Sequence, residues 1–69
     1  MKKSAARATA GSVSVVADDM IADAKEHGDT ELDKSYVIEH VVDSLGESPE
    51  YALEVVREVA RRGFLNRHN

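Results

Sequence analysis

Residues 45–65 read LGESPEYALEVVREVARRGFL and contain, in order, a helix end, a tight turn, a helix start, an amphipathic helix and a second helix end. Ser48, Pro49 and Glu50 form a typical helix start. A hydroxyl can cap the first turn, proline fits its first position, and an acid there meets the positive end of the helix dipole. We expect Gly63 to end the helix in the left-handed conformation and to let Phe64 fold back, as in a Schellman motif. The stretch therefore predicts a helix over residues 49–62.

Two more helices are predicted before this stretch. The first runs from residue 13 or 14 to residue 27, with Ser12 or Ser14 as its cap and Gly28 as its stop. The second runs over residues 34–45, with Asp33 as its N-cap and Gly46 as its stop.

Apolar residues recur with a helical period in all three segments and predict their buried faces. The predicted core positions are Val13, Val16, Ala17, Met20, Ile21 and Ala24 in the first helix, Val37, Ile38, Val41, Val42 and Leu45 in the second, and Ala52, Val55, Val56, Val59 and Ala60 in the third. Leu32 and Val37 have the spacing of a hydrophobic staple. The link of residues 29–32 is expected to be a loop or a brief strand, and residues 64–66 would begin a strand.

Residues 33–67 resemble the helix-turn-helix core of winged-helix domains. The resemblance rests on Leu45-Gly46-x-Ser48-Pro49-Glu50 followed by Val55-Val56-x-x-Val59-x-x-x-Gly63-Phe64-Leu65. In that family the helix that begins with Ser-Pro-Glu lies against the DNA major groove. The resemblance implies an all-α fold of three helices, helix-turn-helix or winged-helix-like, with the wing absent or reduced to a minimal strand. The sequence departs from the family pattern at Glu47, usually apolar, and at Val42, usually small.

The length of 69 residues allows one domain, with a net stability of about 3–5 kcal/mol. The absence of cysteine excludes disulfides and thiolate metal sites. No apolar run approaches the roughly 18 residues of a membrane span, and no hydrophobic segment follows the basic N-terminus as in a secretory signal, so we expect a cytoplasmic protein. His27, His40 and His68 are dispersed, and no catalytic set is recognisable. We therefore expect neither an enzyme nor a metal or cofactor site.

Charge is distributed unevenly along the chain. Residues 1–7 have a charge of +3, from Lys2, Lys3 and Arg7. Residues 8–56 have a charge of −10, because twelve acids outnumber Lys25 and Lys34. Residues 57–69 have a charge of +3, from four arginines and Glu58. A uniformly basic nucleic-acid binder lacks this pattern. The division predicts a flexible basic arm over residues 1–11, a domain over 12–67 and a tail of 68–69. A halophilic source or a GC-rich genome would explain the acidic body.

The first functional hypothesis is a small DNA-binding regulatory protein of helix-turn-helix type, archaeal, viral or plasmid-borne and acting as a dimer. Its contacts with duplex DNA would come from Ser48, Tyr51, Arg57, Arg61, Arg62 and Arg67, and from Lys2, Lys3 and Arg7 in the arm. The alternative for the arm is a terminal segment without a role. Glu50 and Glu54 oppose DNA binding. In the competing interpretation the arginines only pair with acids three or four residues away: Glu54 with Arg57, and Glu58 with Arg61 and Arg62.

The alternative function is an acidic protein–protein interaction or dimerisation module that does not bind DNA. Tyr51 and Leu53 would then form its partner-binding patch, unless Leu53 simply completes the core. Asp19, Asp23 and Glu26 share one face of the first helix, with Asp23 four residues before His27. That face is either a solvated acidic surface or a loose site for a divalent ion.

Overall fold

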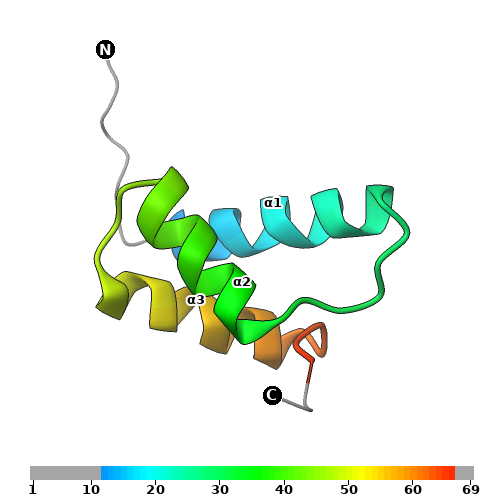
Figure 1. Ribbon diagram of the computed structural model, residues 1–69. Helices are drawn as coiled ribbons and strands as arrows, with labels where there is room; N and C mark the ends of the chain where they lie inside the picture. Colours follow the sequence, from blue (N-terminus) through cyan, green and yellow to red (C-terminus); the bar gives the residue numbers. More distant parts are fainter. Residues whose placement is uncertain (1–11, 67–69) are drawn as a thin grey trace.

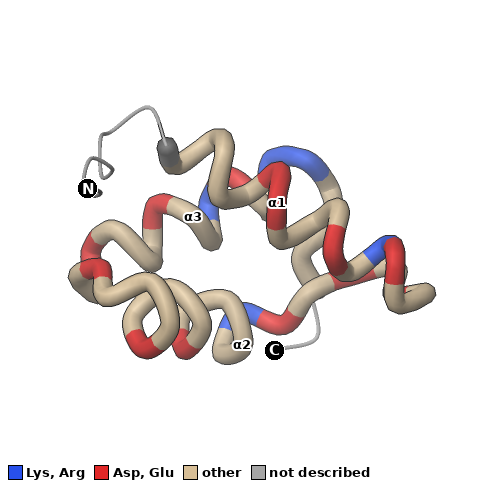
Figure 2. Tube along the Cα trace, turned by 90° about the horizontal axis from the view of Figure 1, so that it is seen from above, with Lys and Arg blue, Asp and Glu red and all other residues tan. Residues whose placement is uncertain are grey.

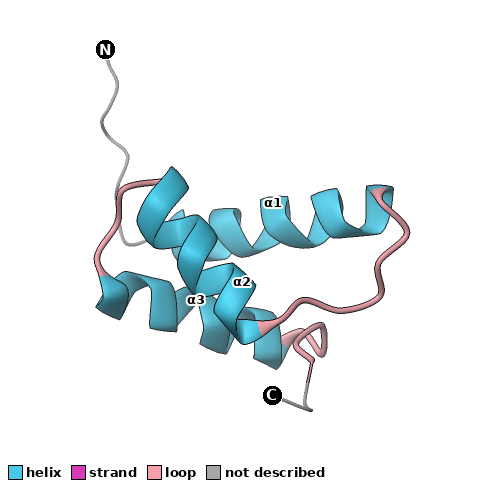
Figure 3. Cartoon of the chain, viewed as in Figure 1, coloured by secondary structure: helices cyan, strands magenta, loops and turns pink. Residues whose placement is uncertain are grey.

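The computed structural model describes residues 12–66, which form three helices joined by loops (Figures 1 and 3). Helix α1 spans Ser12–Glu26, α2 spans Lys34–Glu39 and runs directly into the π-helical segment η2 (His40–Ser44), and α3 spans Pro49–Arg61. The predicted all-α, three-helix fold class is confirmed. Helices α1 and α2 both pack against α3, and they make few contacts with each other.

Helix α1 buries the stripe that the sequence predicts. Ala17, Met20, Ile21 and Ala24 are buried, while Val13 and Val16 are half-buried at the edge of the core. Gly28 ends the helix with a φ of +85°. The Asp29 N–H donates to the Ala24 carbonyl at 2.9 Å and the Gly28 N–H to the Lys25 carbonyl at 3.0 Å. This pair of bonds is a Schellman motif, which fixes where the chain leaves α1.

The start of α2 agrees with the sequence, but its cap does not. Asp33 occupies the N-cap position, yet its side chain makes no capping hydrogen bond to the helix. Its carboxylate instead accepts a hydrogen bond of 2.9 Å from the Asn66 Nδ2 amide. The prediction of a side-chain cap at Asp33 is therefore wrong. The long-range partner, more than thirty positions away in the chain, competes for the same oxygen.

The end of the second helix is wider than an α-helix. The Leu45 N–H donates to the carbonyl of His40, five residues back, at 3.2 Å. Val37 and Val41 are fully buried, but Leu45, which the sequence places in the core, is 43% exposed. A π-helix has more residues per turn than an α-helix, so residues after it no longer lie on the face that the 3.6-residue period predicts. Leu45 is therefore rotated away from the core.

Helix α3 has the start and stop that the sequence predicts. The Ser48 hydroxyl accepts a hydrogen bond of 3.1 Å from the Tyr51 N–H. Gly63, with a φ of +75°, ends the helix, and the Phe64 N–H donates to the Val59 carbonyl at 3.1 Å. The buried face consists of Ala52, Val55, Val56 and Val59. Ala60 was expected in the core but is exposed. It lies beyond Val56 around the helix, past the edge of the surface that α3 shares with its neighbours.

The two segments that the sequence marks as possible strands meet each other. Leu32 and Leu65 form an isolated parallel bridge. The Leu32 N–H donates to the Phe64 carbonyl at 2.8 Å, and the Asn66 N–H donates to the Leu32 carbonyl at 2.7 Å. No other β-pairing occurs within residues 12–66, so any wing there is limited to this minimal element. The bridge brings the end of α3 close to the start of α2 (Figure 1).

The core is built mainly from valine, alanine and a few larger aliphatic side chains. Its fully buried larger members are Val37, Val41, Val55 and Val59. No polar or charged side chain is buried among the described residues. No helix in this part of the chain has the length and apolar character needed to cross a membrane.

Candidate interaction surfaces

The outer face of α3 is divided by charge. After Pro49, its exposed residues are Glu50, Leu53, Glu54, Arg57, Ala60 and Arg61. The acids lie toward the start of the helix and the arginines toward its end. Figure 2 shows acidic residues along all three helices and far fewer basic ones. Residues 12–66 carry thirteen acids against five lysines and arginines, a net charge of −8.

Arg62 joins α3 to α1. Its guanidinium donates to the carboxylate of Asp18, to the Ser14 hydroxyl at 2.7 Å and to the Glu58 carboxylate at 3.1 Å. The hydrogen bond to Asp18, followed by that to Glu58, raises the pKa of Arg62 above its ordinary value. Because these partners lie on both helices, the guanidinium connects the C-terminal end of α3 to α1.

The other described arginines differ in their partners. Arg61 pairs with Glu58 at 2.9 Å, so both predicted pairs of Glu58 are confirmed. Within residues 12–66 no ion pair joins Glu54 to Arg57, and that predicted pair is wrong. Arg57 and Arg61 are therefore the exposed cations of the outer face.

The remaining predicted DNA-binding residues fall into two groups. Lys2, Lys3, Arg7 and Arg67 lie outside the described residues. The Ser48 hydroxyl acts as the cap of α3, and Tyr51 is half-buried against the core.

Tyr51 and Leu53 lie on different flanks of α3. Leu53 is 44% exposed, so the alternative that it completes the core is wrong. Tyr51 lines a shallow hollow of about 400 Å³ with Val13, Glu50 and Glu54, and Leu53 does not belong to that lining. Two residues apart on a helix are separated by about 200°, which explains why the pair forms no single patch.

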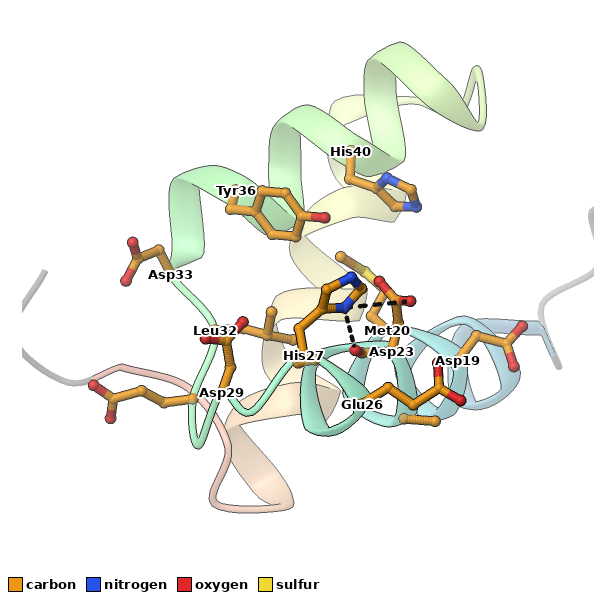
Figure 4. Close-up of a pocket in the computed structure, with 13 residues that line it drawn as sticks. Asp19, Met20, Asp23, Glu26, His27, Asp29, Leu32, Asp33, Tyr36 and His40 are labelled. Atoms are coloured by element: carbon orange, nitrogen blue, oxygen red, sulfur yellow. Dashed lines mark hydrogen bonds and ion pairs between the residues drawn. The ribbon is translucent and has the colours of Figure 1, made fainter.

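An open groove of about 860 Å³ lies between α1 and α2, and we call it the α1–α2 groove (Figure 4). It exists because both helices pack on α3 and scarcely touch each other. Buried Met20, Ala24 and Leu32 contribute its apolar floor. Six carboxylates surround that floor: Asp19, Asp23, Glu26, Asp29, Glu31 and Asp33. The described lining contains no lysine or arginine.

Two stacked rings form the α2 side of the groove. The centroids of Tyr36 and His40 are 6.1 Å apart and their planes differ by 20°. Tyr36 is 48% exposed, and His40 is half-buried. Figure 4 shows the ring of Tyr36 on α2 and the ring of His40 at the start of η2, above Asp23 of α1 and His27, which follows α1. Sequence reasoning missed this pair, although its i,i+4 spacing on one helix was a visible signal.

His27 lies at the end of α1 in the same groove. Its Nδ1 is 2.8 Å from the backbone carbonyl of Asp23 and 3.8 Å from the Asp23 carboxylate. The hydrogen bond to that carbonyl, and then the charge of Asp23, raise the pKa of His27 above its ordinary value of 6.5. Among residues 12–66 no group of three or more acids and histidines is arranged to hold a metal ion.

Comparisons with protein-family models, with curated proteins and with solved structures gave no match for this chain.

Proposed function

We propose that this domain is a protein-interaction module that binds its partner in the α1–α2 groove. The observation that carries the proposal is the combination of an apolar floor and an acidic rim in one open groove. Protein-binding surfaces typically place apolar contacts at the centre and polar groups around them. We further propose that the scaffold is of helix-turn-helix type, on the order of α2, the turn at Gly46 and the Ser48-capped α3.

Charge supports a protein partner over duplex DNA. A net charge of −8 over the described residues repels phosphate, and DNA affinity depends mainly on cations that neutralise phosphates. Arg62 is engaged with α1, and Glu58 neutralises Arg61. Glu50 and Glu54 share the outer face of α3 with the arginines. The groove, in contrast, has a single sign of charge, which favours association with a partner of opposite sign.

The proposal is tested with four synthetic peptides of about 15 residues, long enough for marginal helicity. All four carry the same leucines on an alanine background, and their other positions are arginine, lysine, glutamine or glutamate. We expect the two cationic peptides to bind, with NMR amide shift changes centred on residues that line the α1–α2 groove. Shift changes confined to the outer face of α3, or no binding by any of the four peptides, would contradict the proposal.

DNA binding by a helix-turn-helix regulator is the second candidate, because Arg57 and Arg61 lie exposed on the same half of the outer face of α3. Titration with random duplex DNA at several salt concentrations tests it. If α3 contacts DNA, affinity falls steeply with salt and is lost in the double variant Arg57→Gln, Arg61→Gln. Under the protein-interaction proposal, the wild-type domain shows no duplex binding even at low salt.

A further inference from the structure

The stacked pair of Tyr36 and His40 is the most distinctive element of the α1–α2 groove. The two rings are nearly parallel, 6.1 Å apart between centroids, and lie four residues apart, Tyr36 on α2 and His40 at the start of η2. Nearly half of Tyr36 is exposed. The pair therefore offers a flat aromatic surface at the edge of an apolar floor.

The charge around these rings has one sign. Asp19, Asp23 and Glu26 line the α1 side of the groove, while Asp29, Glu31 and Asp33 line the end where the link enters α2. The groove's described lining has no basic side chain except its histidines. A cation that stacks on the rings would have carboxylates of the rim within reach, and a surface of one charge sign raises the local concentration of oppositely charged groups.

Arginine fits this surface better than lysine. Its guanidinium is planar, stacks on aromatic faces, is weakly hydrated and donates hydrogen bonds to carboxylates in a fixed fork. The ammonium group of lysine is compact and strongly hydrated, and it gains little from a flat surface. A ring pair flanked by carboxylates therefore discriminates between the two cations.

We propose that the occupant of the α1–α2 groove is an arginine-bearing protein segment, which lays a guanidinium on the Tyr36–His40 pair and an aliphatic side chain on the floor at Met20 and Leu32. This inference rests on the proposed function and specifies the chemistry of the partner. Charge complementarity with the acidic rim selects a basic segment, and the stacked rings select arginine within that class.

The experiment compares the affinities of the arginine–leucine and lysine–leucine peptides for the whole chain. We expect the arginine peptide to bind about threefold to fivefold more tightly, which is the contribution of one cation–π contact at an exposed site. Tyr36→Leu keeps an apolar side chain and removes the aromatic face, so it should lower arginine-peptide affinity to the lysine level. Tyr36→Phe keeps the face and should preserve the preference.

A matched pair of double variants tests the rim. Asp19→Asn with Glu26→Gln should weaken both cationic peptides, while Glu50→Gln with Glu54→Gln, the same change of charge on α3, should leave them unaffected. Equal affinity of the arginine and lysine peptides, or a preference that survives Tyr36→Leu, would overturn the arginine assignment while the proposed function stands. Failure of both peptides to bind would contradict both the arginine assignment and the proposed function. A dimer in sedimentation that dissociates on Tyr36→Asp would show a second copy in the groove and also overturn the inference.

Discussion

The guanidinium of Arg62, at the C-terminal end of α3, donates hydrogen bonds to the Asp18 carboxylate and the Ser14 hydroxyl of α1. Glu58, one turn earlier on α3, holds the same guanidinium from the other side. The side chain of Arg62 is 27% exposed, whereas that of neighbouring Arg61 is 71% exposed. The two adjacent arginines therefore have different roles: one connects two helices, and the other lies on the surface of its own helix.

Replacement of these arginines should separate the two roles. We expect Arg62→Met to lower the thermal unfolding midpoint clearly, because Asp18 loses its cation and the link between α1 and Glu58 of α3 is broken. Arg61→Met, the matched control, should stay within about 0.5 kcal/mol of the wild type, as is usual for an exposed ion pair. Circular dichroism melts measure both, and the difference should shrink in high salt. Equal effects of the two substitutions would show that Arg62 does not stabilise the α1–α3 contact.

The small core makes single methyl groups important. Val59 is fully buried in α3, and Val59→Ala removes two methyl groups and leaves a cavity. We expect a loss of about 2 kcal/mol, close to half of the about 3–5 kcal/mol available to a domain of this size. Urea unfolding of the wild type and the variant measures this change in the free energy of unfolding. Val15→Ala, at an exposed position of α1, is the control and should change stability by less than about 0.5 kcal/mol.

Gly63 tests the cost of a left-handed backbone without steric complications. Its φ is +75°, and an added Cβ would meet nothing within 4 Å. Gly63→Ala should therefore lower the free energy of unfolding only by the strain of an L-residue at positive φ, about 1 kcal/mol. D-alanine, introduced by chemical synthesis, fits this conformation and should raise stability by about 0.5 kcal/mol through the unfolded state. A loss of stability with both residues would point to a contact of Gly63 and not to backbone strain.

The raised pKa of His27 gives a measurable signature of the groove. NMR titration should place its midpoint above 6.5. Since the backbone carbonyl of Asp23 is the main cause, Asp23→Asn should remove only part of the increase. A folded-state pKa above the unfolded one stabilises the fold below the unfolded pKa, and this stabilisation is lost as pH rises through the folded pKa. A titration midpoint below 6.5 would contradict the geometry of this end of α1.

The same protonation should oppose binding of a basic partner. His27 gains positive charge as pH falls, in a groove that is also lined by Tyr36, His40 and the six carboxylates Asp19, Asp23, Glu26, Asp29, Glu31 and Asp33. The affinity of the arginine peptide should therefore increase from pH 5.5 to pH 8. His27→Gln should flatten that dependence, and an unchanged profile would show that His27 does not sense the bound peptide.

The sequence predicted the parts of this fold that depend on neighbours within one turn. The cap at Ser48, the stop at Gly63 and the buried valines of α3 follow from local hydrogen bonds and a 3.6-residue period. The π-turn does not follow from local rules, because no residue type specifies an i→i−5 bond. The exposure of Leu45, which results from the π-turn, was therefore missed. Asp33 failed as a cap for a related reason, since its partner Asn66 is distant in sequence.

The candidate site was less predictable than the fold. Its acids were recognised on α1, but the groove depends on how α1 and α2 are spaced on α3, which periodicity along the chain does not report. The Tyr36–His40 pair gains meaning only when α1 faces it. The resemblance to winged-helix domains stays a prediction that rests on the turn and the start of α3.

The backbone bonds between Leu32 and the segment of residues 64–66 close a loop of chain that contains α2, η2 and α3 and leaves α1 outside. Helix α1 is attached to this closed unit by side-chain packing and by the Arg62 contact. The domain should consequently open in two stages under native conditions. Amide hydrogens of α1 would exchange with solvent through partial detachment of that helix, while the amides of Leu32 and Asn66 would exchange only when the closed unit itself unfolds.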